Sequence, residues 1–159
     1  MKKFLLTVLA VMAAVTMVSC NKKAKTETKE AAMRIAMITD YGDITDQSFN
    51  QTTYQACKEY AEAAKLDFKY YKPSGDSTEA RVSSINAAIQ DEYNVLVLPG
   101  FAFAEALVKT ADDNPEVTFI ALDVGEFDII SAAEGLGKAG YKLPNNAFSA
   151  VYAEEIPGY

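Results

Sequence analysis

Short apolar runs alternate with longer segments of helical period along most of the chain, and this alternation predicts a body of successive strands and helices. Turn-forming clusters follow the first two runs, at residues 40–43 and 73–75. Residues 95–98 are continuously apolar, which is typical of a strand that is covered on both faces of its sheet. The predicted strands cover residues 34–39, 66–71, 95–98 and 117–122.

Helices are predicted between these strands. Asp76 and Glu79 have the spacing of a capping box that opens the second helix, and a third helix is predicted over residues 102–113. Residues 125–145 are interpreted as a long, loose connection. The first helix begins near Asp46, and its apolar face is predicted from Phe49, Thr53, Ala56, Cys57, Tyr60 and Ala64.

Successive βαβ units joined by right-handed crossovers form a parallel sheet with helices on both faces. Ligands of such sheets bind beyond the carboxyl ends of the strands. Asp40, Gly100 with Phe101, and Asp123 follow the first, third and fourth predicted strands, so we expect them at one rim. Several candidate residues also have a purely structural interpretation. Asp40 could be a turn former and Gly100 could relieve backbone crowding. Phe49 and Phe101 could be core aromatics.

Composition narrows the classes of function. The chain has 22 acidic and 15 basic residues, a formal charge of −7, and this balance argues against nucleic-acid binding, which depends on neutralising phosphates. It has no histidine, which removes Ser-His-Asp and Cys-His catalysis and His-ligated zinc. GxGxxG and Walker motifs are absent, so we expect no enzyme, no cofactor and no metal, and a binding rim is favoured.

The first twenty residues indicate export. A basic start (Lys2 and Lys3) precedes an apolar stretch from Phe4 to Val18, and Met17-Val18-Ser19-Cys20 resembles a bacterial lipobox. We therefore predict a lipoprotein signal peptide over residues 1–19, with Cys20 lipidated. A transmembrane anchor is the alternative, but the apolar stretch is shorter than the ~20 residues that a spanning helix needs. Residues 20–32 are polar and charged, and they are predicted to form a flexible tether to a cell membrane.

Four ordered blocks of the body resemble the basic membrane protein family, the substrate-binding lipoproteins of ABC transporters that are similar to purine nucleoside receptor lipoproteins. The most specific block is Met37 to Gln51 (MITDYGDITDQSFNQ). The others are residues 93–104, 115–123 and 146–159. Asp43 stands where a second glycine is common in the family.

The resemblance implies a type I periplasmic-binding-protein-like fold that closes two lobes around a nucleoside. It also implies partners, namely an ABC permease and ATPase, and an extracytoplasmic location on a lipid anchor. Such a fold needs about 300 residues, so residues 33–159 are expected to be most of an N-terminal lobe, with the second lobe missing. The strand near residues 147–153 is then expected to lack its place in the sheet, and ligand affinity is expected to be weak or absent. The ligand-binding residues that the resemblance names are Asp40, Phe49, Asn50 and Asp123, with Gly100 and Phe101 lining the cleft.

Other functions stay open at this point. The same domain is compatible with a sensor that feeds a signalling partner, and sugars, autoinducers or other small solutes are alternative ligands within the family. An enzyme on a flavodoxin-like scaffold is a third reading, because a fold alone does not fix a function.

Overall fold

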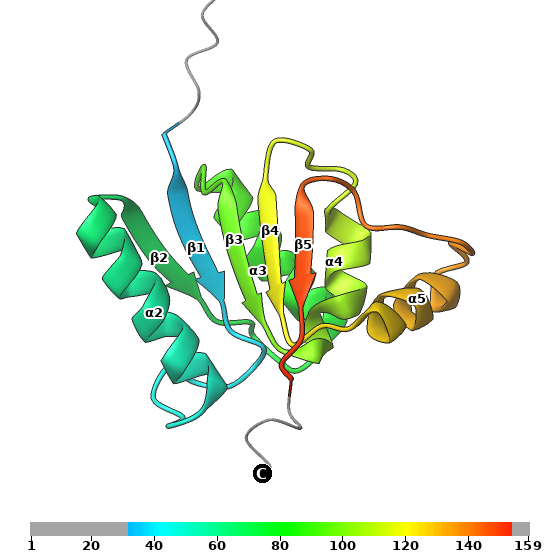
Figure 1. Cartoon of the computed structure of the whole chain (residues 1–159), viewed down its shortest axis with the longest axis horizontal. Helices are drawn as coiled ribbons and strands as arrows, with labels where there is room; N and C mark the ends of the chain where they lie inside the picture. The colour runs from blue at the N-terminus through cyan, green and yellow to red at the C-terminus, as the bar shows by residue number, and fades with distance from the viewer. Residues whose placement is uncertain (1–31, 154–159) are drawn as a thin grey trace, which may run out of the picture. The chain divides into compact units, whose positions relative to one another are not determined.

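The computed structural model describes residues 32–153, and the N-terminal segments predicted above, including Cys20, lie outside them except for residue 32. Its strands form a parallel sheet in the order β2-β1-β3-β4-β5 (Figure 1). The first four strands lie within one residue of the predicted ranges at each end. The strands are β1 (Arg34–Ile38), β2 (Asp67–Tyr71), β3 (Val95–Pro99), β4 (Thr118–Leu122) and β5 (Ala147–Ala150).

The helices divide between the two faces of the sheet because of the direction in which the chain crosses it. The chain steps one way from β1 to β2 and the other way from β2 through β3 and β4 to β5, so right-handed crossovers place α2 alone on one face (Figure 1). The helices are α2 (Phe49–Ala64), α3 (Thr78–Gln90), α4 (Ala104–Thr110) and α5 (Glu126–Gly135), with a 3₁₀ turn at Phe101–Phe103 before α4.

Two apolar clusters hold these layers together. The larger one lies between the sheet and α3, α4 and α5, and its fully buried members include Phe103 and Phe119. The smaller one lies under α2 and centres on Ile35, Ala61 and Val97. Both clusters draw all their side chains from residues 35–147, so a chain that lacks residues 1–19 retains the whole described core.

Coverage by α2 ends partway across the sheet. One row of neighbouring side chains on this face runs through Tyr70, Met37, Val97, Ile120 and Phe148. Met37 and Val97 are buried, Ile120 is half-buried and Phe148 is 58% exposed. Within residues 32–153, the α2 face of the sheet is therefore only half-covered at β4 and exposed at β5.

Five expectations from the sequence are corrected by the structure. The fifth strand does hold a place in the sheet, because β5 pairs in parallel with β4. The connection after Asp123 contains α5, whose start is stabilised by the Asp128 carboxylate accepting a hydrogen bond from the Gly125 N–H at 2.8 Å. The third helix is a 3₁₀ turn followed by α4, and it ends at Thr110.

The fourth correction concerns the start of α3. Ser77 is the N-cap residue, and its hydroxyl accepts a hydrogen bond from the Ala80 N–H. Asp76 instead pairs with the guanidinium of Arg81. The apolar face of α2 also differs from the predicted one, because Ala61 is buried whereas Tyr60 and Ala64 are exposed.

Candidate functional site

The loop after β1 wraps around one carboxylate. Oδ1 of Asp40 accepts hydrogen bonds from the N–H groups of Tyr41 and Gly42, and from Nδ2 of Asn50 at 2.9 Å. Gly42 has to be a glycine here, since a Cβ at this position would lie 2.6 Å from Nδ2 of Asn50. Oδ2 of Asp40 faces Gly100 instead, so one carboxylate oxygen is held by the protein and the other points along the rim.

Asn50 connects this loop to the start of α2. Its side chain is 5% exposed, and Nδ2 donates to both Asp40 and Asp46, the latter at 3.0 Å. Its Oδ1 accepts a longer bond of 3.4 Å from the Asp40 N–H. Asp46 in turn accepts hydrogen bonds from the N–H groups of Ser48 and Gln51, which belong to the first turn of the helix. The amide of Asn50 is thus fully engaged within the protein.

Asp40 is held in its ionised form. Burial raises its pKa, but the hydrogen bonds from Gly42, Tyr41 and Asn50 and the charge of Arg81 together outweigh burial and lower the pKa below the ordinary 3.8. An ionised carboxylate accepts hydrogen bonds only, so the rim is suited to a ligand that presents hydroxyl or N–H donors.

Arg81 is a part of the site that the sequence pattern did not indicate. It lies on α3, is 5% exposed, and donates from Nε to the backbone carbonyl of Asp40 at 3.0 Å. A charged residue this deeply buried is rare unless it is paired. Its ion pair with Asp76 meets that need, and the guanidinium anchors the β1 loop from beneath. The sequence did hold one signal for it, because Arg81 stands four residues before Ile85 and seven before Ala88, the helical spacing of the buried face of α3.

The ends of β3 and β4 complete the rim. Gly100 has φ +114°, a conformation that residues with a side chain rarely adopt, and its N–H donates to the carbonyl of Leu122 at 2.8 Å. Asp123 also has a positive φ of 60°, and its N–H donates to the carbonyl of Ala150 at 2.7 Å. Positive φ at a residue that is not glycine is uncommon, and strained residues of this kind cluster at functional sites.

Aromatic side chains lie on the α2 side of this rim. The ring of Phe49 meets that of Tyr152 edge to face, with the centroids 5.7 Å apart. Burial and the neighbouring carboxylate of Asp123 raise the pKa of Tyr152. Tyr152 therefore bridges two of the predicted site residues, although the sequence analysis did not single it out. Leu122, Val97 and these two rings line a hollow of about 490 Å³ between α2 and the sheet.

The structure brings most of the predicted site residues together at the rim. Asp40, Asn50 and Gly100 are direct neighbours, and Gly100 is tied to the residue before Asp123. Phe49 reaches Asp123 through Tyr152. Phe101 is 68% exposed and lines a different, shallow hollow with Phe127 on the α5 side.

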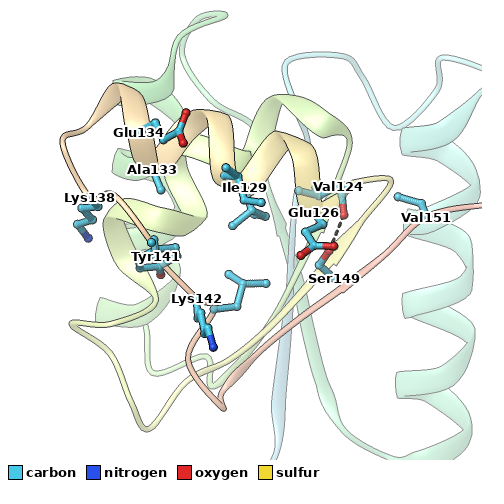
Figure 2. Close-up of a pocket in the computed structure, with 14 residues that line it drawn as sticks. Val124, Glu126, Ile129, Ala133, Glu134, Lys138, Tyr141, Lys142, Ser149 and Val151 are labelled. Carbon is cyan, nitrogen blue, oxygen red and sulfur yellow. Dashed lines mark hydrogen bonds between the residues drawn. The ribbon is translucent and has the colours of Figure 1, made fainter.

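A further hollow of about 680 Å³ lies on the α5 side of β5. It is enclosed by α5, by the connection from Lys138 to Leu143 and by β5 (Figure 2). Its lining combines Ile129 and Ala133 of α5 with Ser149 and Val151 of the β5 segment. None of the predicted site residues lines it.

Residues 32–153 hold neither a metal-binding cluster nor a helix suited to spanning a membrane. No cluster of acidic or cysteine side chains in this part of the chain is arranged to hold a metal ion. Nor does any helix here have the length and apolar character that a membrane span requires.

Comparisons with known proteins show what this chain is similar to. The chain is 27% identical over 148 residues to an uncharacterized lipoprotein of Pyrococcus furiosus, covering 83% of this chain and 37% of that protein. It is 25% identical over 95 residues to the ABC transporter nucleoside-binding protein BmpA of Lactococcus lactis, covering 57% and 26%. The fold matches an ABC transporter solute-binding protein of Aeropyrum pernix with a TM-score of 0.61 at 24% identity, covering 77% of this chain and 29% of that one.

This chain spans about a third of the length of the curated relatives that it matches. The match to a family model is more extensive. The model described as ABC transporter substrate-binding protein PnrA-like covers residues 33–152, which include every strand and the whole rim. The chain therefore belongs to the Bmp family of PnrA-like ABC transporter substrate-binding proteins.

Proposed function

We propose that this chain belongs to a lipid-anchored, extracytoplasmic receptor that binds a nucleoside and delivers it to an ABC permease and its ATPase, without chemistry of its own. The observation that carries the proposal is the shared rim. The ionised Asp40 follows β1 there, and the strained Asp123 follows β4 of the same sheet. The Lactococcus relative, a nucleoside-binding protein, supports this choice of ligand class.

The chemistry of the rim fits a nucleoside. Carboxylates accept hydrogen bonds from ribose hydroxyls and from amino groups of a base. The ring of Phe49 offers an apolar face for stacking on the α2 side of the rim. In this proposal Asn50 acts through Asp40, because its own amide is already engaged by two carboxylates.

Nuclear magnetic resonance of residues 20–159 with adenosine and guanosine tests the proposal. Since the rim is open within the described residues, we expect weak binding, with amide shift changes confined to Gly42, Gly100 and Asp123 and their neighbours. Asp123→Ala should abolish these changes. Asp113→Ala, which alters an exposed carboxylate after α4, should leave them intact. Shift changes centred elsewhere, or changes that persist in Asp123→Ala, would refute nucleoside binding at this rim.

The lipid anchor is proposed from the sequence, since Cys20 lies outside the described residues. Cells that express the full chain should incorporate labelled palmitate into it, and Cys20→Ser should abolish the label and release the protein from the membrane fraction. Cys57→Ser is the matched control, because Cys57 lies on α2 and should not affect anchoring. Membrane retention of the Cys20→Ser variant would instead support an uncleaved apolar anchor.

A further inference from the structure

One buried cation contacts the loops that follow three neighbouring strands. These rim loops are residues 39–48 after β1, 72–77 after β2 and 100–103 after β3. All three begin at the edge of the sheet where the strand arrows end (Figure 1). The cation is Arg81 near the start of α3, and it is 5% exposed. Arg81 is therefore placed to fix the three rim loops relative to one another.

The guanidinium of Arg81 divides its donors between two of the rim loops. Nε donates to the backbone carbonyl of Asp40 at 3.0 Å, and Nη2 donates to the carboxylate of Asp76 in an ion pair. Because the guanidinium is planar and rigid, the direction of one of these bonds determines the direction of the other. The loop after β1 and the loop after β2 are thus held at a fixed separation by one side chain.

The third rim loop contacts the face of the same guanidinium. Cζ of Arg81 lies over the ring of Phe103, 5.9 Å from its centroid, which is within the range of a cation–π contact. Phe103 is fully buried, and its N–H donates to the carbonyl of Gly100 at 3.1 Å. A Cβ at Gly100 would lie 3.8 Å from Oδ2 of Asp40. Arg81 therefore connects the two residues that border the space beside this carboxylate oxygen.

Stability alone does not account for a cation at this position. Arg81 shares the buried face of α3 with Ile85 and Ala88, which are both fully buried. Replacing a buried ion pair by well-packed apolar side chains is often neutral or stabilising, so an apolar residue could also hold α3 against the sheet. An apolar residue could not donate to two loops at once.

We propose that Arg81 is a positioning residue of the binding rim, which holds the three rim loops in one arrangement so that Asp40 presents Oδ2 beside Gly100. A role of this arrangement in ligand binding rests on the function proposed above, whereas the arrangement itself needs no ligand. The contacts of Arg81 are made with residues 40, 76 and 103, so they do not depend on what covers the outer surfaces of the body.

Three variants of residues 20–159 test the positioning role without any nucleoside, so a failure here leaves the proposed function standing. Arg81→Met removes the charge and the donors. Arg81→Lys keeps the charge but replaces two donor nitrogens by one. Lys109→Met is the matched control on the neighbouring helix, because Lys109 pairs with Glu105 at 2.7 Å and with Glu79 at 3.6 Å. Within residues 32–153, Lys109 makes no ion pair with a rim loop.

Amide hydrogen exchange reports the arrangement of the loops. In both Arg81 variants, the amides of Gly42 and Phe103 should exchange about 10- to 100-fold faster than in the wild type, as expected when hydrogen bonds to a charged group are lost. The amide of Gly125, which donates to Asp128 after β4, should keep its wild-type rate. Lys109→Met should leave all three rates unchanged. Equal acceleration at all three amides, or wild-type rates in either Arg81 variant, would overturn the proposal.

Carbon-13 NMR of the aspartate carboxyl groups adds a reading that a purely structural role would not move. Burial raises the pKa of Asp40, while its hydrogen bonds and the charge of Arg81 lower it. The pKa of Asp40 should therefore rise in Arg81→Met and stay lower in Arg81→Lys than in Arg81→Met.

Asp46 is the internal control for this titration. Burial raises its pKa, and hydrogen bonds from Asn50 and from N–H groups at the start of α2 lower it, without a contribution from Arg81. The pKa of Asp46 should stay the same in every variant. An Asp40 pKa that does not change in Arg81→Met, or that changes together with the pKa of Asp46, would overturn the proposal. If Arg81→Met does not fold, the exchange pattern of Arg81→Lys decides alone.

Discussion

At the start of α2, one amide side chain organises two carboxylates. Asn50 holds Asp40 at the rim and Asp46 at the helix start, and Arg81 fixes the same loop through a backbone carbonyl. The free oxygen of Asp40 is therefore positioned before any ligand arrives. Preorganised groups of this kind lower the cost of ordering a site on binding.

The pH dependence of stability should reveal the ionised state of Asp40. Because its pKa is lowered in the folded chain, the stabilisation it gives is complete above the unfolded value of 3.8 and is lost as the pH falls through the folded pKa. Asp40→Asn should cost about 1.5–3 kcal/mol at pH 7, as for hydrogen bonds to a charged group. Urea unfolding should show the gap between the two proteins narrowing below pH 4.

The other carboxylates titrate in both proteins and cancel in this difference. Asp113→Asn is the control, because Asp113 is exposed and has no hydrogen bond within residues 32–153. This substitution should change the free energy of unfolding little, both at pH 7 and below pH 4. A gap between wild type and Asp40→Asn that stays constant with pH would mean that the loop does not distinguish the charged carboxylate from the amide.

Backbone conformation, not space, should limit substitution at Gly100. An added Cβ would lie 3.6 Å from Cβ of Asp40, an ordinary contact, but φ +114° strains any residue with a side chain. Gly100→Ala should therefore lower the free energy of unfolding by about 1–3 kcal/mol. Gly75→Ala is the control in open space without a positive φ, and it should be neutral or slightly stabilising in the same urea titration. Equal effects would contradict the role of strain.

At the scale of the elements, the strands were predictable and the connection to β5 was not. The first four strands are short apolar runs bounded by turn residues, so their pattern alone locates them. α5 was missed because Gly125 and Gly137 flank it, Gly135 is its last residue, and only Ile129 and Ala133 of its residues are buried. The start of α5 depends on the carboxylate of Asp128, which accepts a hydrogen bond from the N–H of Gly125 three residues earlier. This cap lacks the Ser or Thr that usually marks a helix start in a sequence.

The position of the site in the fold was predictable, but the hydrogen bonds within it were less so. Strand order and direction suffice to bring Asp40, Gly100 and Asp123 to one edge. The use of the Asn50 amide and the anchoring by Arg81 depend on contacts between elements, which periodicity does not describe. Tyr152 was missed for the same reason, because β5 had to take its place in the sheet before the ring could meet Phe49.

One asparagine should determine how firmly β5 is held. Nδ2 of Asn146 contacts three backbone carbonyls, those of Ala111, Asn114 and Val117, at 2.9 to 3.1 Å. Asn146→Ala would remove the donor from these partly buried carbonyls. It should therefore lower the free energy of unfolding by about 1–3 kcal/mol, measured by thermal or urea unfolding. Hydrogen exchange should then accelerate first in β5.

The neighbouring Asn145 is the natural control. It is exposed and makes no side-chain hydrogen bond within residues 32–153, so Asn145→Ala should change stability little. If Asn146→Ala were equally mild, the start of β5 would have to be fixed by its pairing with β4 alone.

For the molecule as a whole, the uneven coverage of the sheet raises the question whether α2 can separate from the sheet on its own. Three helices bury one face, whereas α2 alone covers the other and shields a small cluster that includes Cys57. Burial raises the pKa of the Cys57 thiol to about 11 from an ordinary 9.0. The reactivity of this thiol therefore reports whether α2 leaves the sheet separately or only when the entire body unfolds.

We expect Cys57 to become accessible only when the entire body unfolds. In residues 20–159 carrying Cys20→Ser, reaction of Cys57 with a thiol reagent at pH 8 should be about 10- to 100-fold slower in the folded chain than in urea, because burial lowers the thiolate fraction. The rate should rise with urea in parallel with the loss of circular dichroism. Glu59→Cys in a Cys57→Ser background, on the exposed face of α2, should react quickly throughout. Rapid modification of Cys57 before the unfolding transition would show that α2 detaches on its own, and the Asn50 network would then have to be a local contact that opens without the core.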